Sequence, residues 1–158
     1  MKYGMDETKI QVNFLKALIN KKQVIFCEGL EGKTGLSDGN ACFFIPNESL
    51  FLDKKDRKYF SIKSHISSFN DAVVVNMTDE QITTEDVRKV IIFESKIEQA
   101  PFGFATHEKK IVIGIDQKYL QFFGSDVRYY ATSQKMPLFV TNDDQELLAF
   151  ILPVNIRR

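Results

Sequence analysis

The chain of 158 residues has no tryptophan, two cysteines and two histidines, so reactive centres have few residues to draw on. Neither histidine stands in an H-x-x-x-H pair and no C-x-x-C occurs, although these are common spacings of zinc ligands. We interpret His65 and His107 as surface or strand residues rather than catalytic bases. Carboxylates are scattered among lysines and arginines, as in residues 53–58, a pattern typical of a solvated loop. We expect a protein that is not an enzyme and needs no cofactor and no metal.

Long apolar runs are also missing. The longest spans about six residues, whereas a membrane helix needs about 18. The N-terminus leads directly into a charged amphipathic segment, so no cleavable signal is expected. A chain of this length can bury about 70% of its unfolded surface as one domain, and a second domain of ordinary size would not fit. The sequence therefore predicts a single soluble, cytoplasmic domain over residues 1–158.

An excess of charge of either sign is absent as well. Lysine plus arginine and aspartate plus glutamate each number 21, which gives a formal net charge of zero. A DNA-binding surface would therefore need its positive charge gathered on one face. Apolar residues recur at three- and four-residue spacing from Thr8 to Asn20, which predicts an amphipathic helix. Its apolar stripe contains Ile10, Phe14, Leu15, Leu18 and Ile19.

The opposite side of this predicted helix carries cations and an amide. Lys9, Asn13 and Lys16 follow one another at offsets of four and three. Lys21 and Lys22 stand at the C-terminal end, where positive charge suits the helix dipole. Lysine and asparagine donate hydrogen bonds to phosphates whatever the base. The pattern is compatible with a face that follows a DNA backbone without reading sequence, although the residues by themselves favour an ordinary solvated helix face.

Residues 27–34 end in Gly-Lys-Thr after an apolar strand, as a phosphate-binding loop does. Cys27 stands where the first glycine of that motif is required. Glu28 and Glu31 would place negative charge inside a cradle for phosphates. The helix that should hold the phosphate is replaced by a run rich in glycine and polar residues. We expect a Gly-rich hairpin loop here, not nucleotide hydrolysis, and we expect Cys27 and Cys42 to be core thiols rather than disulfide or metal ligands.

Turn signals and short apolar runs divide most of the remaining chain into strands. The Asp-Gly pair at 38–39 and the Asn-Asp-Asp run at 142–144 predict hairpin turns, so neighbouring strands should be antiparallel. A short helix or helical turn is predicted over 78–89, where Thr84, Asp86 and Val87 suggest a helix start. Strands are expected at 3–6, 23–28, 40–45, 50–52, 59–62, 72–77 and 90–93. The predicted fold class is α+β, with helices on one face of antiparallel sheets.

Residues 110–154 form one unit in the predicted pattern, with a strand, a helix and three strands in succession. The first strand ends at 113–115 and the helix runs from Asp116 to Phe123. The three strands that follow cover 127–131, 137–141 and 147–152. This order of elements carries most of what the sequence indicates about function.

Four short motifs lie in this unit, and in order they resemble the C-terminal end of bacterial DNA polymerase III beta subunits, the sliding clamps. The motifs are Tyr119-Leu120, Asp126-Val127-Arg128-Tyr129, Asn142-Asp143-Asp144 and Ile151-Leu152-Pro153-Val154. A second, looser similarity lies at 36–41, which departs from the clamp pattern because Asn40 and Ala41 replace a His-Arg pair. The resemblance covers the last quarter of the chain well and the first third loosely.

This resemblance implies a DNA-clamp-like fold of two strand-helix-three-strand units, about 1–62 and about 101–158, joined by connecting strands and a turn at about 63–100. It also implies a non-catalytic, processivity-type accessory of DNA replication, with DNA and a polymerase as partners. The residues implied at the DNA phosphates are Lys9, Asn13, Lys16, Lys21, Lys22 and, on the second helix, Lys118. The residues implied in a hydrophobic pocket for partner peptides are Ile151, Leu152, Pro153 and Val154.

The size of the chain restricts this interpretation, because a full bacterial clamp ring contains six domains of this kind and the chain would supply only one. A single domain would have to form a homo-oligomer, pair with another clamp chain or act without a ring, and a phage-like derivative would fit that size. The alternative is a protein-binding module that targets or inhibits a host replication clamp or polymerase. Residues 117–123 fit the loose Gln-x-x-Leu-x-Phe pattern of clamp-binding peptides, although their position between strands favours a core helix.

Overall fold

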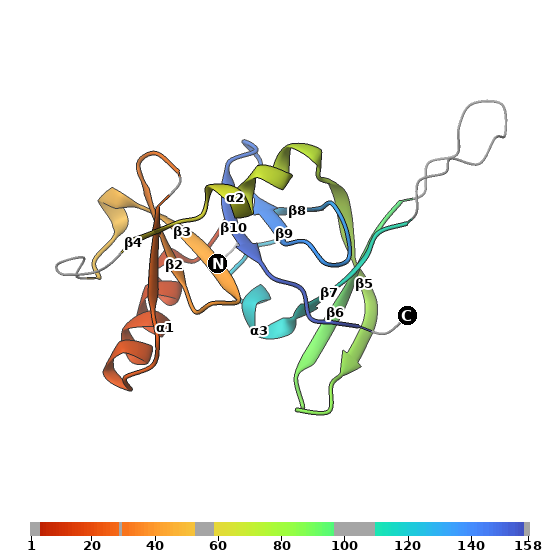
Figure 1. Ribbon diagram of the computed structural model, residues 1–158, viewed down its shortest axis with the longest axis horizontal. Helices are drawn as coiled ribbons and strands as arrows, with labels where there is room; N and C mark the ends of the chain where they lie inside the picture. The colour runs from red at the N-terminus through yellow and green to blue at the C-terminus, as the bar shows by residue number, and fades with distance from the viewer. Residues whose placement is uncertain (1–3, 29, 53–58, 97–109, 157–158) are drawn as a thin grey trace, which may run out of the picture.

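The computed structural model describes residues 4–28, 30–52, 59–96 and 110–156 (Figure 1). His107, the charged run 53–58 and the beginning of the strand expected at 3–6 lie outside these residues. The described helices are α1 (Glu7–Ile19), α2 (Lys63–Ile66) and α3 (Gln117–Leu120), with 3-10 helices η1 (Asn47–Ser49) and η2 (Ser67–Asp71). None of them has the length and apolar character that a membrane crossing requires. The strands are β1 (Ile25–Glu28), β2 (Lys33–Ser37), β3 (Ala41–Pro46), β4 (Tyr59–Ser61), β5 (Val73–Thr83), β6 (Lys89–Ser95), β7 (Val112–Asp116), β8 (Arg128–Ala131), β9 (Leu138–Thr141) and β10 (Leu147–Ile151).

These strands form a ten-stranded sheet in the order β4-β1-β2-β3-β10-β9-β8-β5-β6-β7. β1 pairs parallel with β4, and the other neighbours are antiparallel. The predicted α+β class is confirmed. The predicted turns at 38–39 and 142–144 join β2 to β3 and β9 to β10, as expected. Pairing of β3 with β10, through Phe43 and Ala149, joins the first part of the chain to its C-terminal unit.

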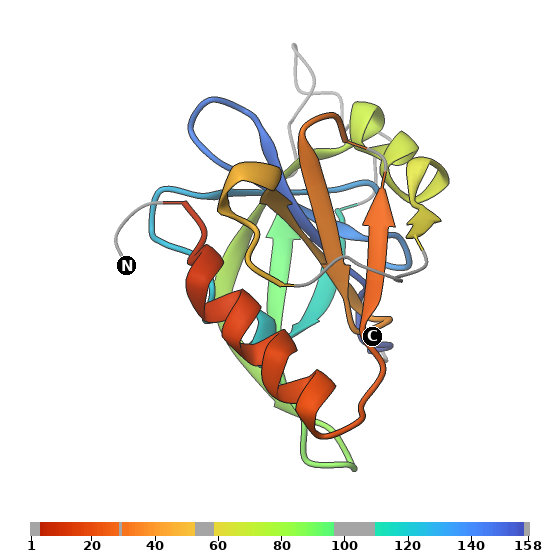
Figure 2. The same ribbon diagram turned by 90° about the vertical axis from the view of Figure 1, so that its left-hand side faces the viewer.

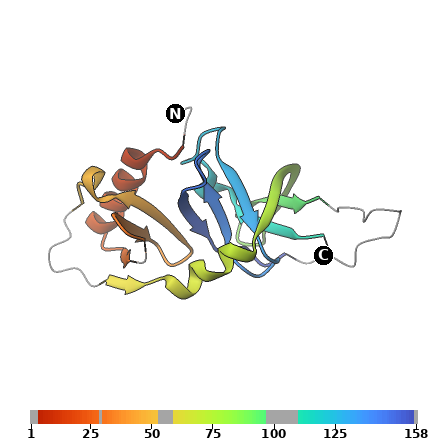
Figure 3. The same cartoon turned by 90° about the horizontal axis from the view of Figure 1, so that it is seen from above.

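Helices cover both faces of the sheet centre, so the expectation of helices on one face holds for α1 and α3 only. Phe43 packs with α1 and α3, whereas its neighbours Cys42 and Phe44 pack on the other face with residues of α2 and η2. Figure 3 shows α1 and α2 on opposite sides of the strands, and Figure 2 shows α1 running diagonally along one side of the sheet. Strands buried on both faces lose the apolar–polar alternation of a half-exposed sheet, and β3, β9 and β10 are accordingly apolar at nearly every position.

The C-terminal tail covers the outer part of the sheet. Val154 and Ile156 pack against Val90 and Ile92 of β6. The backbone N–H of Val154 donates to the carbonyl of Gly114 on β7, at 2.8 Å. A Cβ at Gly114 would lie 2.8 Å from the side chain of Ile156, so the glycine is needed for this close approach.

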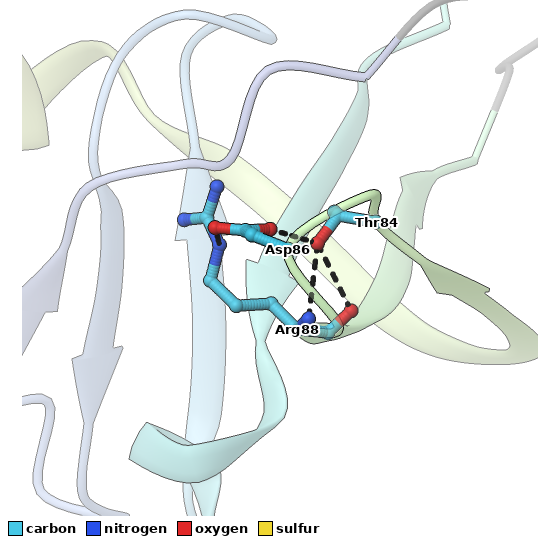
Figure 4. A network of polar contacts seen from close by, with 3 residues as sticks. All are labelled: Thr84, Asp86 and Arg88. Atoms are coloured by element: carbon cyan, nitrogen blue, oxygen red, sulfur yellow. Dashed lines mark hydrogen bonds and ion pairs between the residues drawn. The ribbon is translucent and has the colours of Figure 1, made fainter.

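Residues 78–89 do not form the predicted helical turn. β5 continues to Thr83 and turns back into β6 through the contacts drawn in Figure 4. Thr84 Oγ1 donates to Asp86, Arg88 N donates to Thr84 Oγ1 at 3.0 Å, and Arg88 Nε lies 2.9 Å from Asp86 Oδ2. The hydrogen bond from Thr84, followed by that from Arg88, lowers the pKa of Asp86. Threonine and aspartate cap turns as readily as helices, so strand pairing decided between the two outcomes.

The hairpin loop expected within 27–34 is confirmed, because β1 and β2 pair antiparallel on either side of it. Three further local details differ from the predictions. No strand was predicted over 33–37, but these residues form β2, which pairs with both β1 and β3. Residues 50–52 are not a strand but follow η1, and the side chain of Gln11 holds this segment to α1 by accepting from Phe51 N at 2.8 Å and donating to Ser49 O at 3.0 Å. The second helix is shorter than predicted, because α3 ends at Leu120.

Val87, at the tip of the β5–β6 hairpin, has a φ of 65° and is 77% exposed. A left-handed conformation costs an L-residue about 1–2 kcal/mol, whereas asparagine tolerates it. We expect Val87→Asn to raise the free energy of unfolding by about 0.5–1 kcal/mol in urea titrations. Val73→Asn, at an exposed extended position of β5, is the control and should not stabilise. Equal effects of the two substitutions would contradict the conformational explanation.

Gly35 on β2 lies between the two cysteines. A Cβ built there would meet Cys42 Sγ at 2.6 Å and Cys27 Cβ at 2.9 Å. We expect Gly35→Ala to lower the free energy of unfolding by about 1–3 kcal/mol, because a closely packed core resists added volume. Cys42→Ala removes the sulfur atom that the new methyl group would meet. The loss of unfolding free energy in the double variant should therefore be smaller, by at least about 0.5 kcal/mol, than the sum of the losses in the two single variants. Additive losses in urea titrations would show that the contact with Cys42 is not the cause of the destabilisation.

Candidate functional site

α1 and α3 lie on the same face of the sheet, and Phe43 positions both. Its ring centre is 6.3 Å from that of Phe14 on α1, 6.3 Å from Tyr119 on α3 and 5.3 Å from Phe122. Each helix begins at an aspartate cap: Asp6 accepts from Lys9 N and Asp116 from Lys118 N, both at 3.1 Å. An aspartate in this position satisfies one of the free N–H groups at a helix start.

Backbone contacts tie the start of α1 to the end of α3. Asp6 N donates to the carbonyl of Phe122 at 2.8 Å, and Gly124 N donates to the carbonyl of Gly4 at 2.7 Å. Asp126 accepts from Gly4 N at 2.6 Å. The spacing of the two helices is therefore set by hydrogen bonds at one end and by the Phe43 ring beneath them.

Asp38, in the β2–β3 turn, connects the first part of the chain to α3. Its Oδ1 accepts from Asn40 N at 2.9 Å and from Ala41 N at 3.0 Å. Its Oδ2 accepts from the hydroxyl of Tyr119 at 2.6 Å. Burial, together with this bond to a carboxylate, raises the pKa of Tyr119 well above its ordinary value, so the hydroxyl stays protonated and donates. This polar contact holds α3 at one side of the sheet face that α1 and α3 cover, which we call the α1–α3 face.

A groove of about 510 Å³ runs between the two helices. Its floor is formed by Phe14, Phe43, Tyr119 and Phe122, and its rim includes Asn13, Lys22 and Lys118. The structure therefore brings together three of the six residues predicted to approach DNA phosphates. Asp38 and Tyr119, which line the groove and bond each other, were not predicted as site residues, and neither was Gln11, which ties residues 49–51 to α1. The Asp-Gly turn signal pointed to Asp38 as a turn residue, but no local signal indicated its contact with α3.

The six predicted DNA-facing residues are all exposed: Lys9, Asn13, Lys16, Lys21, Lys22 and Lys118. Lys9 Nζ lies 5.8 Å from the ring centre of Phe122, and Lys118 Nζ lies 5.0 Å from that of Tyr119. Lys16 and Lys21 are not among the residues lining the groove. Within the described residues the ion pairs are Lys33–Glu146, Arg88–Asp86 and Lys110–Glu94, so none of the six pairs with a described carboxylate.

The apolar stripe predicted for α1 is only partly buried. Ile10 and Phe14 are in the core, but Leu15 is 41% exposed and Ile19 is 70% exposed. The sheet beneath α1 contacts a narrower part of the helix than the sequence pattern suggests. The outer flank of α1 therefore combines exposed apolar residues with the exposed cations.

The C-terminal residues predicted to build a partner pocket serve mainly the fold. Ile151 is fully buried in the main core, and Val154 is buried against β6. Leu152 N donates to the carbonyl of Asn40 at 2.7 Å. Pro153 and Val154 border a hollow of about 330 Å³ that Gln134, Lys135 and Asn155 complete. The partly exposed members of the segment are Leu152 and Pro153.

The segment 117–123 is a core element, as its position between strands predicted. Tyr119 and Phe122 are buried, and Leu120 and Phe123 pack against the same core. Residues 27–34 likewise contribute to structure, since Lys33 in β2 lies 3.5 Å from Glu146 and Thr34 donates to Asn47 at 2.7 Å. Cys27 and Cys42 are free, buried and hydrogen-bonded to each other; this bond lowers the pKa of Cys27 and raises that of Cys42.

Comparisons with protein-family models, curated proteins and solved structures found no match. Among the described residues, no group of three or more histidines, cysteines and acidic side chains is placed to hold a metal ion. The function of the chain therefore has to be inferred from its own surfaces. The α1–α3 face is the candidate site, because it combines a groove with exposed cations.

The contact between Asp38 and Tyr119 can be tested by stability. We expect Asp38→Ala to lower the free energy of unfolding by about 2–3 kcal/mol, because it removes the acceptor of three hydrogen bonds, and Tyr119→Phe to cost about 1 kcal/mol. Asp143→Ala, in the exposed β9–β10 turn, is the control and should change stability by no more than about 0.5 kcal/mol. If Asp38→Ala proved as mild as Asp143→Ala in urea titrations, Asp38 would not be holding α3.

Proposed function

We propose that this chain is a non-catalytic accessory of DNA replication, similar to a sliding-clamp domain, that contacts duplex DNA along α1 and α3. The observation that carries the proposal is that Lys9 and Lys16 on α1, Lys22 just after it and Lys118 on α3 are all exposed on two neighbouring elements. Lysine and asparagine side chains bind phosphates without reading the bases. A formal net charge of zero leaves only this local attraction, which suits a protein that slides rather than binds one sequence.

The order of the strands supports the comparison with a clamp domain. β1, β2 and β3 follow α1, and β8, β9 and β10 follow α3. The two sets meet at the β3–β10 pair, so the order β1-β2-β3 is mirrored by β10-β9-β8. Two related strand-helix-three-strand units packed about a central axis would have this arrangement.

Assembly into a ring would be head-to-tail. The strand order begins with β4 and ends with β7, whose Gly114 carbonyl already accepts from Val154 of the C-terminal tail, so the two ends of the sheet are unlike. Contact between unlike surfaces of identical chains is head-to-tail and closes into a ring when the rotation permits. The rival function, a module that docks on a host clamp through residues 117–123, gains no support, because Tyr119 and Phe122 of that segment are buried.

Binding to duplex DNA tests the role of the α1–α3 face. We expect a double variant, Lys16→Glu with Lys118→Glu, to weaken duplex binding at least tenfold at low salt. The slope of log affinity against log salt should fall in magnitude by about 2, since each lost phosphate contact removes about 0.9. Lys63→Glu with Lys135→Glu changes the net charge equally and alters exposed lysines outside the α1–α3 face. Equal weakening by both pairs, in fluorescence anisotropy, would show that the face has no special role.

The solution mass tests whether a ring forms without another chain. Light scattering after size exclusion, over a range of concentrations and with or without DNA, should detect a closed oligomer, with a hexamer as the expected form. Stimulation of a polymerase on long templates would then be measured with the same preparation. A strict monomer under all conditions would overturn the autonomous ring, and the chain would have to work with another clamp subunit or without encircling DNA.

A further inference from the structure

Three large apolar side chains of α1 are exposed to solvent. Val12 is 36% exposed, Leu15 41% and Ile19 70%. Fraying of the helix end does not explain the exposure of Ile19, because Lys22 N donates to the carbonyl of Ala17 at 2.8 Å and closes the last turn. Figure 2 shows α1 along the outside of the molecule. Exposed apolar residues that gather in one place commonly mark a binding surface.

These residues have the spacing of a contact between two helices. Leu15 follows Val12 by three positions, and Ile19 follows Leu15 by four. Such offsets place side chains in a line along one side of a helix, as positions a and d of a heptad do. Ile10 and Phe14, which anchor α1 in the core, stand on a different side of the helix. A second helix could therefore pack on this line while α1 stays in place on the sheet.

The charge beside the apolar line is positive. With Val12 and Ile19 at position a, Lys9 and Lys16 both fall at position e, where charged side chains pair with those of an adjoining helix. Both lysines are exposed, and neither pairs with a described carboxylate. Lys9 Nζ lies 5.8 Å from the ring centre of Phe122, and an exposed contact of this kind is weak enough to exchange for a carboxylate. The flank thus favours an incoming helix with acidic residues beside its apolar stripe.

A second copy of the chain is a poorer partner than an acidic helix. In an antiparallel contact between two copies of α1, Lys9 and Lys16 would face the same lysines of the other copy, and like charges oppose association. In a parallel contact, position e faces position g, which holds Gln11 and Leu18 rather than an acidic residue. Glu7, the acidic residue of α1, falls at neither position. Charge therefore favours a different chain as the partner.

A lipid surface also fits less well. Helices that lie in a membrane interface carry a broad apolar face that commonly includes tryptophan or phenylalanine. The exposed apolar line of α1 is narrow, as in a coiled-coil contact, and Phe14, the aromatic residue of the helix, is buried in the core. The polar residues Asn13 and Asn20 are exposed on the far side of the lysines.

We propose that the outer flank of α1, formed by Val12, Leu15, Ile19, Lys9 and Lys16, docks an acidic amphipathic helix of a partner protein. The apolar stripe of that helix would cover the three exposed side chains, and its carboxylates would pair with the two lysines. The line is short, so the contact is weak and reversible. The inference goes beyond the proposed replication role, since it requires no DNA. Lys16 is assigned to both ligands, so the partner helix and duplex DNA would compete for α1.

Synthetic peptides test the docking surface. An acidic peptide has leucine at positions a and d of each heptad and glutamate at e and g, and a basic peptide has lysine in place of glutamate. We expect the full-length chain to bind the acidic peptide at least about tenfold more tightly than the basic one, in fluorescence anisotropy at low salt. A scrambled acidic peptide has the same charge without the apolar stripe, and it should also bind at least about tenfold more weakly. Equal binding of the ordered and scrambled acidic peptides would overturn the proposal.

Removal of the apolar line tests whether the peptide binds at α1. Leu15→Ala with Ile19→Ala keeps the charge and the helix propensity of α1. This double variant should bind the acidic peptide at least about tenfold more weakly than wild type. Val73→Ala with Val74→Ala removes two exposed apolar side chains from β5 and is the matched control, which should bind within about twofold of wild type. Equal losses in the two double variants would show that the peptide does not bind at α1.

Reversal of charge tests the role of the lysines. Lys9→Glu with Lys16→Glu should bind the basic peptide more tightly than the acidic one, because the attraction at position e changes sign. Lys63→Glu with Lys135→Glu changes the net charge equally on exposed lysines outside α1, and it should keep the preference for the acidic peptide. If the preference for the acidic peptide survived the reversal on α1, the proposed pairing would be wrong.

The outcomes also separate this inference from the proposed function. Leu15→Ala with Ile19→Ala keeps every lysine, so duplex binding should stay within about twofold of wild type. Duplex binding that depends on Lys16, together with peptide binding indifferent to this variant, would sink the docking surface and leave the replication role standing. Peptide binding that depends on Leu15 and Ile19, without any duplex binding, would keep the docking surface and remove the DNA contact.

Two further measurements examine the other occupants. Vesicles containing phosphatidylserine would be the ligand, and the proposal wrong, if they bound through Leu15 and Ile19 and the acidic peptide did not. A concentration-dependent mass that Leu15→Ala with Ile19→Ala abolished, without peptide binding, would assign the flank to a second copy of the chain instead. Thermal unfolding of each variant, compared with wild type, shows whether the substituted chain is folded.

Discussion

The structure depends on the packing of Phe43 at the centre of the sheet. Its backbone pairs with Leu36 of β2 and Ala149 of β10, so it stands where the first part of the chain meets the C-terminal unit. Its ring contacts Phe14, Phe122 and the stacked ring of Phe123, at centre distances of 6.3, 5.3 and 6.0 Å. Aromatic clusters of this kind bury large areas in specific relative orientations. The separation of α1 from α3 depends on this ring together with the backbone hydrogen bonds that tie the start of α1 to the end of α3.

Because several elements share the burial of the sheet, the outer surfaces of α1 and α3 remain exposed to solvent. α2 and η2 pack over Cys42, Phe44 and Phe139, while the C-terminal tail covers β6 on the outer part of the sheet. The buried apolar surface is thus divided among several clusters, and α1 and α3 bury only part of their own surfaces. The cations of both helices stay exposed, and the Asp38–Tyr119 contact holds α3 in place without using those cations.

Predictions were accurate where local pattern and tertiary environment agree. The helix expected over 8–20 and the strands at 127–131, 137–141 and 147–152 match α1, β8, β9 and β10 within about one residue at each end. Errors arose where contacts from elsewhere decided. Pairing with β6 drew residues 78–83 into β5, and the strand at 33–37, which pairs with β1 and β3, was not predicted. Propensity is a weak prior against such contacts.

The sequence by itself determined the α+β class, the hairpin turns at 38–39 and 142–144, and which side of α1 carries the cations, because each depends on residues close together in the chain. Tertiary structure alone decided that Lys22 and Lys118 border one groove and that Asp38 bonds Tyr119, 81 positions away. It also decided that Ile151 and Val154 are packed inside, whereas the resemblance to a clamp terminus implied a partner surface. Distances between residues remote in sequence depend on how the whole sheet packs, and periodicity carries no information about them.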